Sequence, residues 1–470
     1  MYGFRLPKDF LIGTANSAFQ SEGAWDRDGK SESNMDYYAK LYAGKPMRKI
    51  GSGSKQVVKC YSEELPDRGC FFYDHYEEYI EDMAKTGQNT YRMSLSWPRI
   101  IPTGVGDVNP KAIEYYNKVI DCLIAHNITP FVDIYHWDLP QCLQEQGGFM
   151  NPQMPQWYEA YAKVCFENFG DRVKLWSTFN EPDVFIGGGY ERTSFPPFRD
   201  GAYFTDNKIR DFQLAAHHCI LSHFRAVRLY RSMNLGGKIG VVNCLSAISP
   251  ATMTEADFGA AERQTCRRFE WWIQPMLEGT YPRVLFRDCP DTVAANMPEN
   301  FQQDLDQWFS PMDFVGINYY IANRTQHDPA KALKCTNVES FYSAPGQQFA
   351  PYPAGLYDVV SYICKRFHNV EVYVTENGCA LPNQYDEALE CNDPERISYI
   401  REHMRMCVRL IEAGYNLKGY YYWNDADSYE ELDGYNLRFG LTWVDHATGK
   451  RSWKKSRYYF SEICKTHMVD

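Results

Sequence analysis

The stretch "KAIEYYNKVIDCLIAHN" (111–127) is followed almost directly by "TPFVDIYHW" (129–137), and the two have different periodicities. Apolar residues in the first segment recur at the helical period, whereas the second is a short run rich in β-branched and aromatic residues. A helical segment that leads into such a run is typical of the crossover connection between parallel strands. This pair is one unit of a pattern that extends along the chain.

Eight β-branched and aromatic runs alternate with longer helical patterns. The runs are "FLIGTAN" (10–16), "TYRMSLSW" (90–97), "TPFVDIYHW" (129–137), "LWSTFNE" (175–181), "KIGVVNC" (238–244), "DFVGINYY" (313–320), "EVYVTEN" (371–377) and "GYYYWND" (419–425). Eight such units predict the α/β class and a single (β/α)8 TIM barrel. The chain has 470 residues, and such barrels usually have about 250, so we expect enlarged βα loops.

No Ser-, Gly- or Pro-rich segment is long enough to separate two cores, so we expect residues 1–470 to form one domain. The extra residues contain the Gly, Pro and polar side chains that loops need, and they are expected at 38–70, 183–210, 245–310 and 321–352.

The formal net charge of -11 excludes a nucleic-acid or anionic-membrane partner on electrostatic grounds and favours a small neutral ligand. The first residues have no long apolar core behind a basic start, so we expect neither a signal peptide nor a transmembrane span. The 15 cysteines are an odd number without paired Cys-x-x-Cys spacing, which predicts reduced thiols and a cytoplasmic protein. The oligomeric state does not follow from these features.

Two glutamates end predicted strands: Glu181 in "TFNEP" and Glu376 in "VTENG". The carboxyl ends of barrel strands share one face, so both side chains should face one cavity. Two carboxyls across a sugar-sized gap are the minimum apparatus for glycoside hydrolysis. A single strand glutamate is more simply explained by a buried salt bridge, but two in these contexts favour catalysis.

Six motifs together resemble those of glycoside hydrolase family 1, the retaining β-glycosidases that include β-glucosidases. They are "SLSWPRIIPTG", "YHWDLP", "TFNEP", "GINYY", "VTENG" and "DGYNLRFGL", and they occur in the order of that family. The resemblance covers nearly the whole chain, from "LPKDFLIGTANSAFQSEGAW" to "WVDHATGKRSWKKS". It implies a (β/α)8 barrel.

The resemblance implies that Glu181 is the acid/base and Glu376 the nucleophile, which would form a covalent glycosyl-enzyme. A retaining mechanism would place the two carboxyls ~5–5.5 Å apart. The expected supporting residues are Arg92, which would hold the nucleophile ionised, Tyr320 with Asn318 beside it, which would hydrogen-bond the nucleophile, and Asn180, which would bind the hydroxyl next to the anomeric carbon.

The resemblance also implies a set of substrate-binding residues and no cofactor. No cluster of residues has metal-ligand spacing, so we expect no metal. Gln20, His136 and Glu430 match the family's binders of the sugar hydroxyls, and Trp423 matches the aromatic floor beneath the ring. Phe349 stands where the family often has a tryptophan that stacks on the aglycone. The full set is Gln20, His136, Trp137, Trp423, Glu430, Glu431, Phe349 and Phe439.

The last barrel loop, "WNDADSYEELDGYNLRFG" (423–440), departs from the family pattern, because Glu431 stands where a second tryptophan is common. The change removes an indole donor and adds acceptors and negative charge. In the interpretation that we favour, Glu431 points away and Tyr429 fills the space. In the alternative, Glu431 shifts selectivity toward another epimer or an amino sugar.

Members that act on 6-phosphorylated sugars have Ser, Lys and Tyr at three positions of this loop. Here those positions hold Glu430, Leu437 and Phe439, which offer a phosphate no cation, so we reject a phosphosugar substrate.

These features predict a retaining exo-β-glycosidase that hydrolyses terminal non-reducing β-D-glucosyl residues, or β-galactosyl or related ones, of a small glycoside or oligosaccharide. One alternative is a non-catalytic glycan- or glycolipid-binding protein on the same fold, which would not need both carboxylates with Arg92, Tyr320 and Asn180. The other is a transglycosidase, which would use the same residues.

Overall fold

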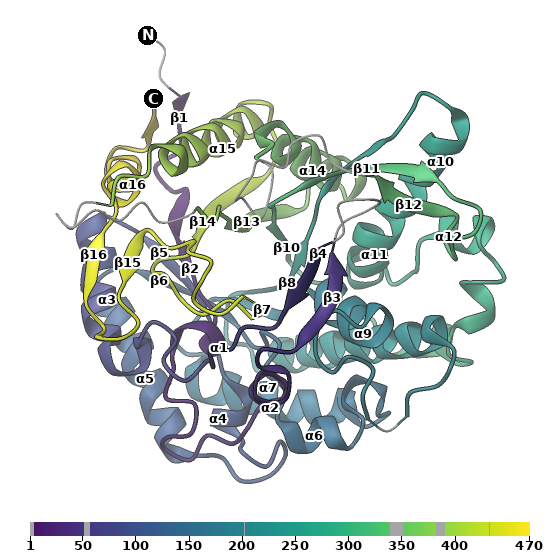
Figure 1. The fold of residues 1–470 in the computed structure, drawn as a ribbon, viewed down its shortest axis with the longest axis horizontal. Coiled ribbons are helices and arrows are strands. Elements are labelled where there is room, and N and C mark those ends of the chain that lie inside the picture. Colours follow the sequence, from purple (N-terminus) through teal and green to yellow (C-terminus); the bar gives the residue numbers. More distant parts are fainter. Residues whose placement is uncertain (1–3, 51–56, 202, 339–350, 382–390, 432) are drawn as a thin grey trace.

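A closed barrel of eight parallel strands forms the centre of the protein (Figure 1). The computed structural model describes residues 4–50, 57–201, 203–338, 351–381, 391–431 and 433–470. Around the barrel the strands are β2 (Leu11–Ala15), β5 (Thr90–Ser94), β6 (Thr129–Asp133), β7 (Leu175–Asn180), β8 (Lys238–Cys244), β10 (Phe314–Asn318), β13 (Glu371–Asn377) and β14 (Leu417–Trp423). The barrel closes where Trp423 of β14 lies opposite Ala15 of β2. Each predicted run overlaps one strand, which confirms the (β/α)8 prediction.

Helices surround the barrel on its outer face (Figure 1). The longer ones are α3 (Phe72–Thr86), α5 (Pro110–Ala125), α7 (Met154–Phe169), α9 (Lys208–Ser232), α14 (Pro353–Arg366), α15 (Pro394–Glu412) and α16 (Lys455–Thr466). In α5 the Asn109 side chain caps the first turn by accepting from the Lys111 amide at 3.2 Å. None of the helices in these described ranges is both long and apolar enough to cross a membrane.

The predicted insertions contain regular elements of their own. They hold β3 (Pro46–Ile50), β4 (Val57–Cys60), α8 (Pro182–Ile186), η3 (Gly187–Arg192), β9 (Ala247–Pro250), α10 (Glu255–Thr265), η4 (Cys266–Glu270), α11 (Trp271–Glu278), α12 (Arg283–Asp288), η5 (Ala294–Asn296), α13 (Phe301–Trp308), β11 (Ala322–His327) and β12 (Cys335–Val338). The segment 245–310, expected as loop, is therefore largely helical. Polar residues that suggested a loop, such as Glu255 and Glu262, lie on the exposed face of α10.

Short elements complete the chain. They are α1 (Ala18–Ser21), α2 (Asn34–Tyr42), α4 (Trp97–Ile100), α6 (Gln141–Glu145), η2 (Gly148–Met150), β15 (Thr442–Val444) with β16 (Arg451–Trp453), and β1 (Phe4–Arg5) with β17 (Met468–Val469). The antiparallel pair of β1 and β17 brings the two ends of the chain together (Figure 1).

Aromatic side chains fill the inside of the barrel. Phe131 of β6 makes edge-to-face contacts with Phe314, Tyr373 and Tyr421, at centroid distances of 5.5, 5.9 and 5.6 Å. These residues come from four different strands, so their packing fixes the strands against one another. The interior is therefore a packed core with the polar strand ends above it.

Replacing Phe131 with Ala should lower the free energy of unfolding by about 3–5 kcal/mol, because it leaves a cavity among rings that cannot collapse together. Ile124→Ala on α5 is the matched control, since that side chain is 42% exposed and its loss should cost less than about 0.5 kcal/mol. Urea unfolding followed by tryptophan fluorescence measures both. Equal losses for the two variants would contradict a central role for the Phe131 contacts.

Candidate active site

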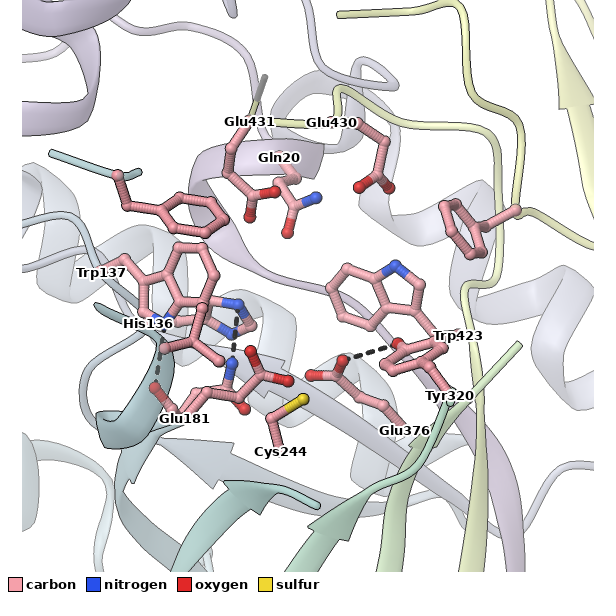
Figure 2. Close-up of a pocket in the computed structure, with 14 residues that line it drawn as sticks. Gln20, His136, Trp137, Glu181, Cys244, Tyr320, Glu376, Trp423, Glu430 and Glu431 are labelled. Carbon is pink, nitrogen blue, oxygen red and sulfur yellow. Dashed lines mark hydrogen bonds between the residues drawn. The ribbon is translucent and has the colours of Figure 1, made fainter. Parts of the chain in front are cut away.

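The carboxyl ends of the barrel strands surround a cavity of about 190 Å3 (Figure 2). The predicted residues that line it are Gln20, His136, Trp137, Asn180, Glu181, Tyr320, Glu376, Trp423, Glu430, Glu431 and Phe439. Arg92 and Asn318 do not line the cavity, but they contact the two glutamates from behind its wall. Phe349 lies outside the described residues.

Val184, Phe195 and Cys244 also line the cavity and were not identified from the sequence. Cys244 is the last residue of β8, so its place at a strand end was the available signal. Val184 and Phe195 follow β7 in the extended loop, where nothing local distinguishes them from packing residues.

Glu181 is placed by a sharp turn between strand and helix. It follows β7 in the left-handed region, with φ 53° and ψ 57°, and Pro182 begins α8 directly after it. Its amide donates to the Val242 carbonyl at 2.8 Å, which ties the turn to the neighbouring strand. This conformation is uncommon for a residue with a side chain, and such residues cluster at functional sites.

A chain of hydrogen bonds connects the two glutamates. The Asn318 amide donates to Glu181 Oε1 at 2.7 Å and to Asn180 Oδ1 at 3.0 Å. Arg92 donates through Nη2 to the same Asn180 oxygen at 2.7 Å and through Nη1 to Glu376 Oε1 at 2.6 Å. The two carboxyls therefore belong to one polar network.

Glu376 is surrounded by groups that favour its ionised form. Besides Arg92, the Tyr320 hydroxyl donates to Glu376 Oε2 at 2.8 Å (Figure 2). Arg92 also forms an ion pair with Asp133 at 2.5 Å. Asp133 was not identified as a site residue, although an acidic residue inside a buried run was a usable signal.

The two carboxyls have different electrostatic environments. Burial raises the pKa of Glu181, and the nearby Glu376 charge adds to this effect, so that it reaches about 8. Burial also raises the pKa of Glu376, but Arg92 and the Tyr320 hydroxyl oppose that rise. Glu376 therefore ionises first, and Glu181 keeps its proton near neutral pH.

His136 lines the cavity and has one buried polar atom without a partner among the described residues. The Asn180 amide donates to His136 Nε2 at 3.0 Å, so this nitrogen accepts and Nδ1 carries the proton. Nδ1 has no hydrogen-bond partner among the described residues, although the side chain is only 4% exposed. The Trp423 ring stacks near His136, with centroids 5.9 Å apart. These two rings form part of the cavity wall.

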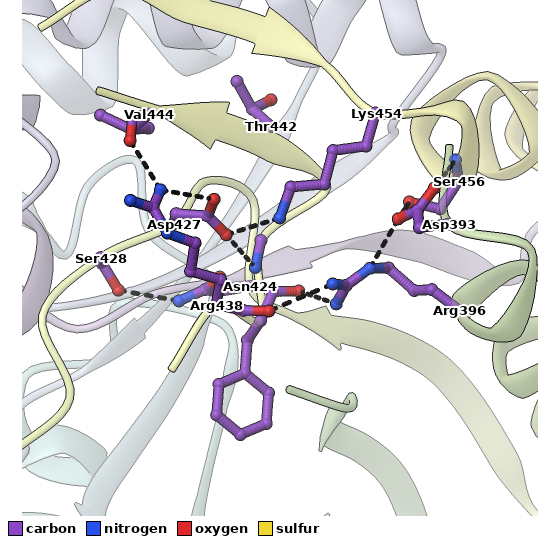
Figure 3. A network of polar contacts seen from close by, with 12 residues as sticks. Asp393, Arg396, Asn424, Asp427, Ser428, Arg438, Thr442, Val444, Lys454 and Ser456 are labelled. Atoms are coloured by element: carbon purple, nitrogen blue, oxygen red, sulfur yellow. Dashed lines mark hydrogen bonds and ion pairs between the residues drawn. The ribbon is translucent and has the colours of Figure 1, made fainter. Parts of the chain in front are cut away.

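A buried ionic network holds the loop after β14 in place (Figure 3). Asp427 is wholly buried and pairs with Lys454 at 2.7 Å and with Arg438 at 3.2 Å. Burial acts to raise the pKa of Asp427, but these two cations outweigh it and hold the pKa below its usual value. Arg396 donates to the Phe439 carbonyl at 2.7 Å. The loop that presents Glu430 and Glu431 is thus anchored at several points.

Glu431 points into the cavity (Figure 2), so the interpretation that we favoured from the sequence is wrong. Tyr429 does not take its place: the Tyr429 ring packs edge-to-face against Phe19 at 5.9 Å, and its hydroxyl donates to the Glu64 carbonyl at 3.2 Å. The apolar ring is fully buried in the core, which leaves the carboxylate to face the polar cavity.

Taken together, the site offers a proton donor and an ionised carboxylate on one side and hydrogen-bonding groups around the rest of the wall. Such an arrangement can bind a polyhydroxylated ring and cleave a glycosidic bond.

Known proteins are similar to this chain in both sequence and fold. The model of glycosyl hydrolase family 1 matches residues 3–469. Beta-glucosidase A of Thermotoga maritima is 35% identical over 468 residues, which cover 99% of each chain. The 6-phospho-beta-glucosidase GmuD of Bacillus subtilis is also 35% identical, with 98% of each chain covered.

Solved structures resemble this chain over nearly its whole length. A family 1 β-glucosidase from Thermotoga maritima superposes with a TM-score of 0.90 at 34% identity, with all of both chains covered. The Thermotoga maritima β-glucosidase in complex with deoxynojirimycin gives a TM-score of 0.89 at 34% identity, covering 99% of this chain and 100% of the other. The chain therefore belongs to glycosyl hydrolase family 1 and is a retaining glycoside hydrolase.

Proposed function

We propose that the cavity is the active site, at which terminal β-D-glucosyl residues are removed from small glycosides, with Glu376 as nucleophile and Glu181 as acid/base. The observation that carries this assignment is the hydrogen-bonded chain through Arg92, which leaves two buried carboxyls in one cavity but, of the two, places the guanidinium directly against Glu376 alone. The names of the relatives, β-glucosidases among them, support glucose as the sugar.

In the first step, the ionised Glu376 attacks the anomeric carbon. A bond forms between that carbon and a Glu376 oxygen as the bond to the leaving oxygen breaks, and Glu181 gives its proton to the departing oxygen. Asn180 binds the hydroxyl beside the anomeric carbon, where hydrogen bonds strengthen in the transition state.

In the second step, water attacks the anomeric carbon of the glycosyl-enzyme. Glu181, now a carboxylate, takes a proton from that water, and the bond to Glu376 breaks to release the sugar. Arg92 and Tyr320 then stabilise the returning charge on Glu376, since both donate to it. An alcohol in place of water would give a transglycosylation product, which product analysis with added alcohol distinguishes.

We also propose that residues 1–470 form one domain and that the protein is cytoplasmic. The first proposal is supported by the continuous β/α alternation, and the second by the cysteines, of which the fourteen described ones are free thiols, most of them buried.

Glu376→Gln should reduce kcat/KM for 4-nitrophenyl β-D-glucoside roughly a thousandfold or more, because the covalent intermediate cannot form. Added azide separates the two roles: Glu376→Ala should give the α-glucosyl azide by direct attack, whereas Glu181→Ala should give the β-glucosyl azide through the glycosyl-enzyme. Nuclear magnetic resonance of the products identifies the anomer. Glu412→Gln, at the exposed end of α15, is the control and should behave as the parent. The opposite pattern of anomers would reverse the assignment.

The parent enzyme should lose kcat/KM as pH rises through about 8, the raised pKa of Glu181, because the acid must be protonated to assist departure. In Glu181→Gln this alkaline limb should disappear when the leaving group is 2,4-dinitrophenol, which needs no proton. A pH profile of both proteins with that substrate and with the nitrophenyl glucoside tests this. Persistence of the same limb in the variant would assign it to another group.

A further inference from the structure

The cavity wall opposite the catalytic pair carries two adjacent carboxylates. Glu430 and Glu431 point into the cavity from the loop after β14, with Gln20 between them, and face Glu181 and Glu376 across the gap (Figure 2). Glu431 occupies the position at which the resemblance leads us to expect tryptophan. The second carboxylate on this wall is thus a feature of this chain.

The same loop contains carboxylates that do have cationic partners, which makes a useful contrast. Asp425 pairs with Arg457 at 3.2 Å. Asp427 pairs with Lys454 at 2.7 Å (Figure 3). Neither Glu430 nor Glu431 forms an ion pair with any of the described residues. The loop therefore neutralises its structural carboxylates and leaves the two that face the cavity without a counter-charge.

The cation beneath the cavity, Arg92, already has two anionic partners. Arg92 is shared between Glu376 at 2.6 Å and Asp133 at 2.5 Å, so it has no excess charge to offer the opposite wall. Burial, with the charges of Glu376 and Asp433, raises the pKa of Glu431 to about 8. Burial and the adjacent Glu431 likewise raise the pKa of Glu430 well above its usual value. A ligand cation at this wall would relieve that repulsion.

A second observation concerns the kind of ligand. His136 Nδ1 is a buried donor without a partner among the described residues, on a side chain that lines the same cavity. The rings of His136 and Trp423 and the carboxyls of Glu430 and Glu431 all line this cavity. A sugar fits such a site, with its ring against the aromatic residues and a donor-rich substituent facing Glu430 and Glu431.

We propose that the cavity selects β-glycosides whose sugar carries an ammonium group on carbon 3, 4 or 6, with Glu431 as the specificity-determining residue. This inference rests on the proposed function. The anomeric carbon lies at Glu181 and Glu376, and Asn180 faces the substituent of carbon 2, so the remaining substituents face the opposite wall. An N-acetylated sugar lacks the charge and is excluded from this preference.

The test compares kcat and KM for 4-nitrophenyl β-D-glucoside with its 3-amino-3-deoxy, 4-amino-4-deoxy and 6-amino-6-deoxy analogues, below neutral pH where the amines are protonated. The 2-amino-2-deoxy analogue carries the same charge at the wrong carbon and is the matched substrate control. We expect at least one of the three analogues to exceed the glucoside about tenfold or more in kcat/KM. The gain should lie mainly in KM, because the contact exists before the transition state.

Glu431→Gln, which removes the charge and keeps the shape, should lower that preference about fivefold or more, mainly by raising KM for the amino sugar. Glu431→Trp should lower it at least as far. Glu412→Gln on the outer helix α15 removes a carboxylate away from the cavity and should leave the preference unchanged. Circular dichroism of each variant checks that it is folded.

The outcomes separate this inference from the function on which it rests. Release from the plain glucoside without a gain for any of the three analogues overturns the amino-sugar preference and leaves the proposed function intact. A gain that survives Glu431→Gln overturns the role of Glu431. No release from any of the glycosides by the folded parent overturns the proposed function and this inference with it.

Discussion

The site depends on one buried charge, the Arg92 guanidinium beneath the cavity. It donates to Glu376 and Asn180 and pairs with Asp133, so a single side chain of β5 links strands β6, β7 and β13. A guanidinium fully removed from water is stable only with such partners, and its planar fork offers several donors in fixed directions. Because the partners come from distant parts of the chain, this arrangement exists only after the barrel has closed.

That constraint also explains why two chemically identical side chains behave differently. Glu376 lies against Arg92 and the Tyr320 hydroxyl. Among the described residues, Glu181 receives a hydrogen bond only from the Asn318 amide, and it lies in the field of Glu376. The barrel provides rigid strand ends, and the left-handed turn at Glu181 directs its side chain over the rim. The difference in ionisation is therefore a product of geometry and not of residue type.

The loop after β14 uses charge in two ways. Its buried aspartates are paired with Lys454, Arg438 and Arg457 and hold the backbone in position. Its glutamates face the cavity without a cation among the described residues, so that wall presents two carboxyl groups to a ligand. The ion pairs of the aspartates hold the loop, and with it the two glutamates, in position. A structural network therefore determines which groups face the ligand.

Local patterns in the chain were sufficient to predict the eight strands, the barrel, the family and the positions of Glu181 and Glu376. Strand burial and the polar residue at a strand end are properties of a few consecutive residues. The motifs and their order along the chain are visible in the sequence itself. The orientation of Glu431, the sharing of Arg92 with Asp133 and the lining residues Val184 and Phe195 came only from the folded chain. Each of these depends on contacts between segments remote in sequence, where packing decides which side chain occupies the core and which faces the cavity.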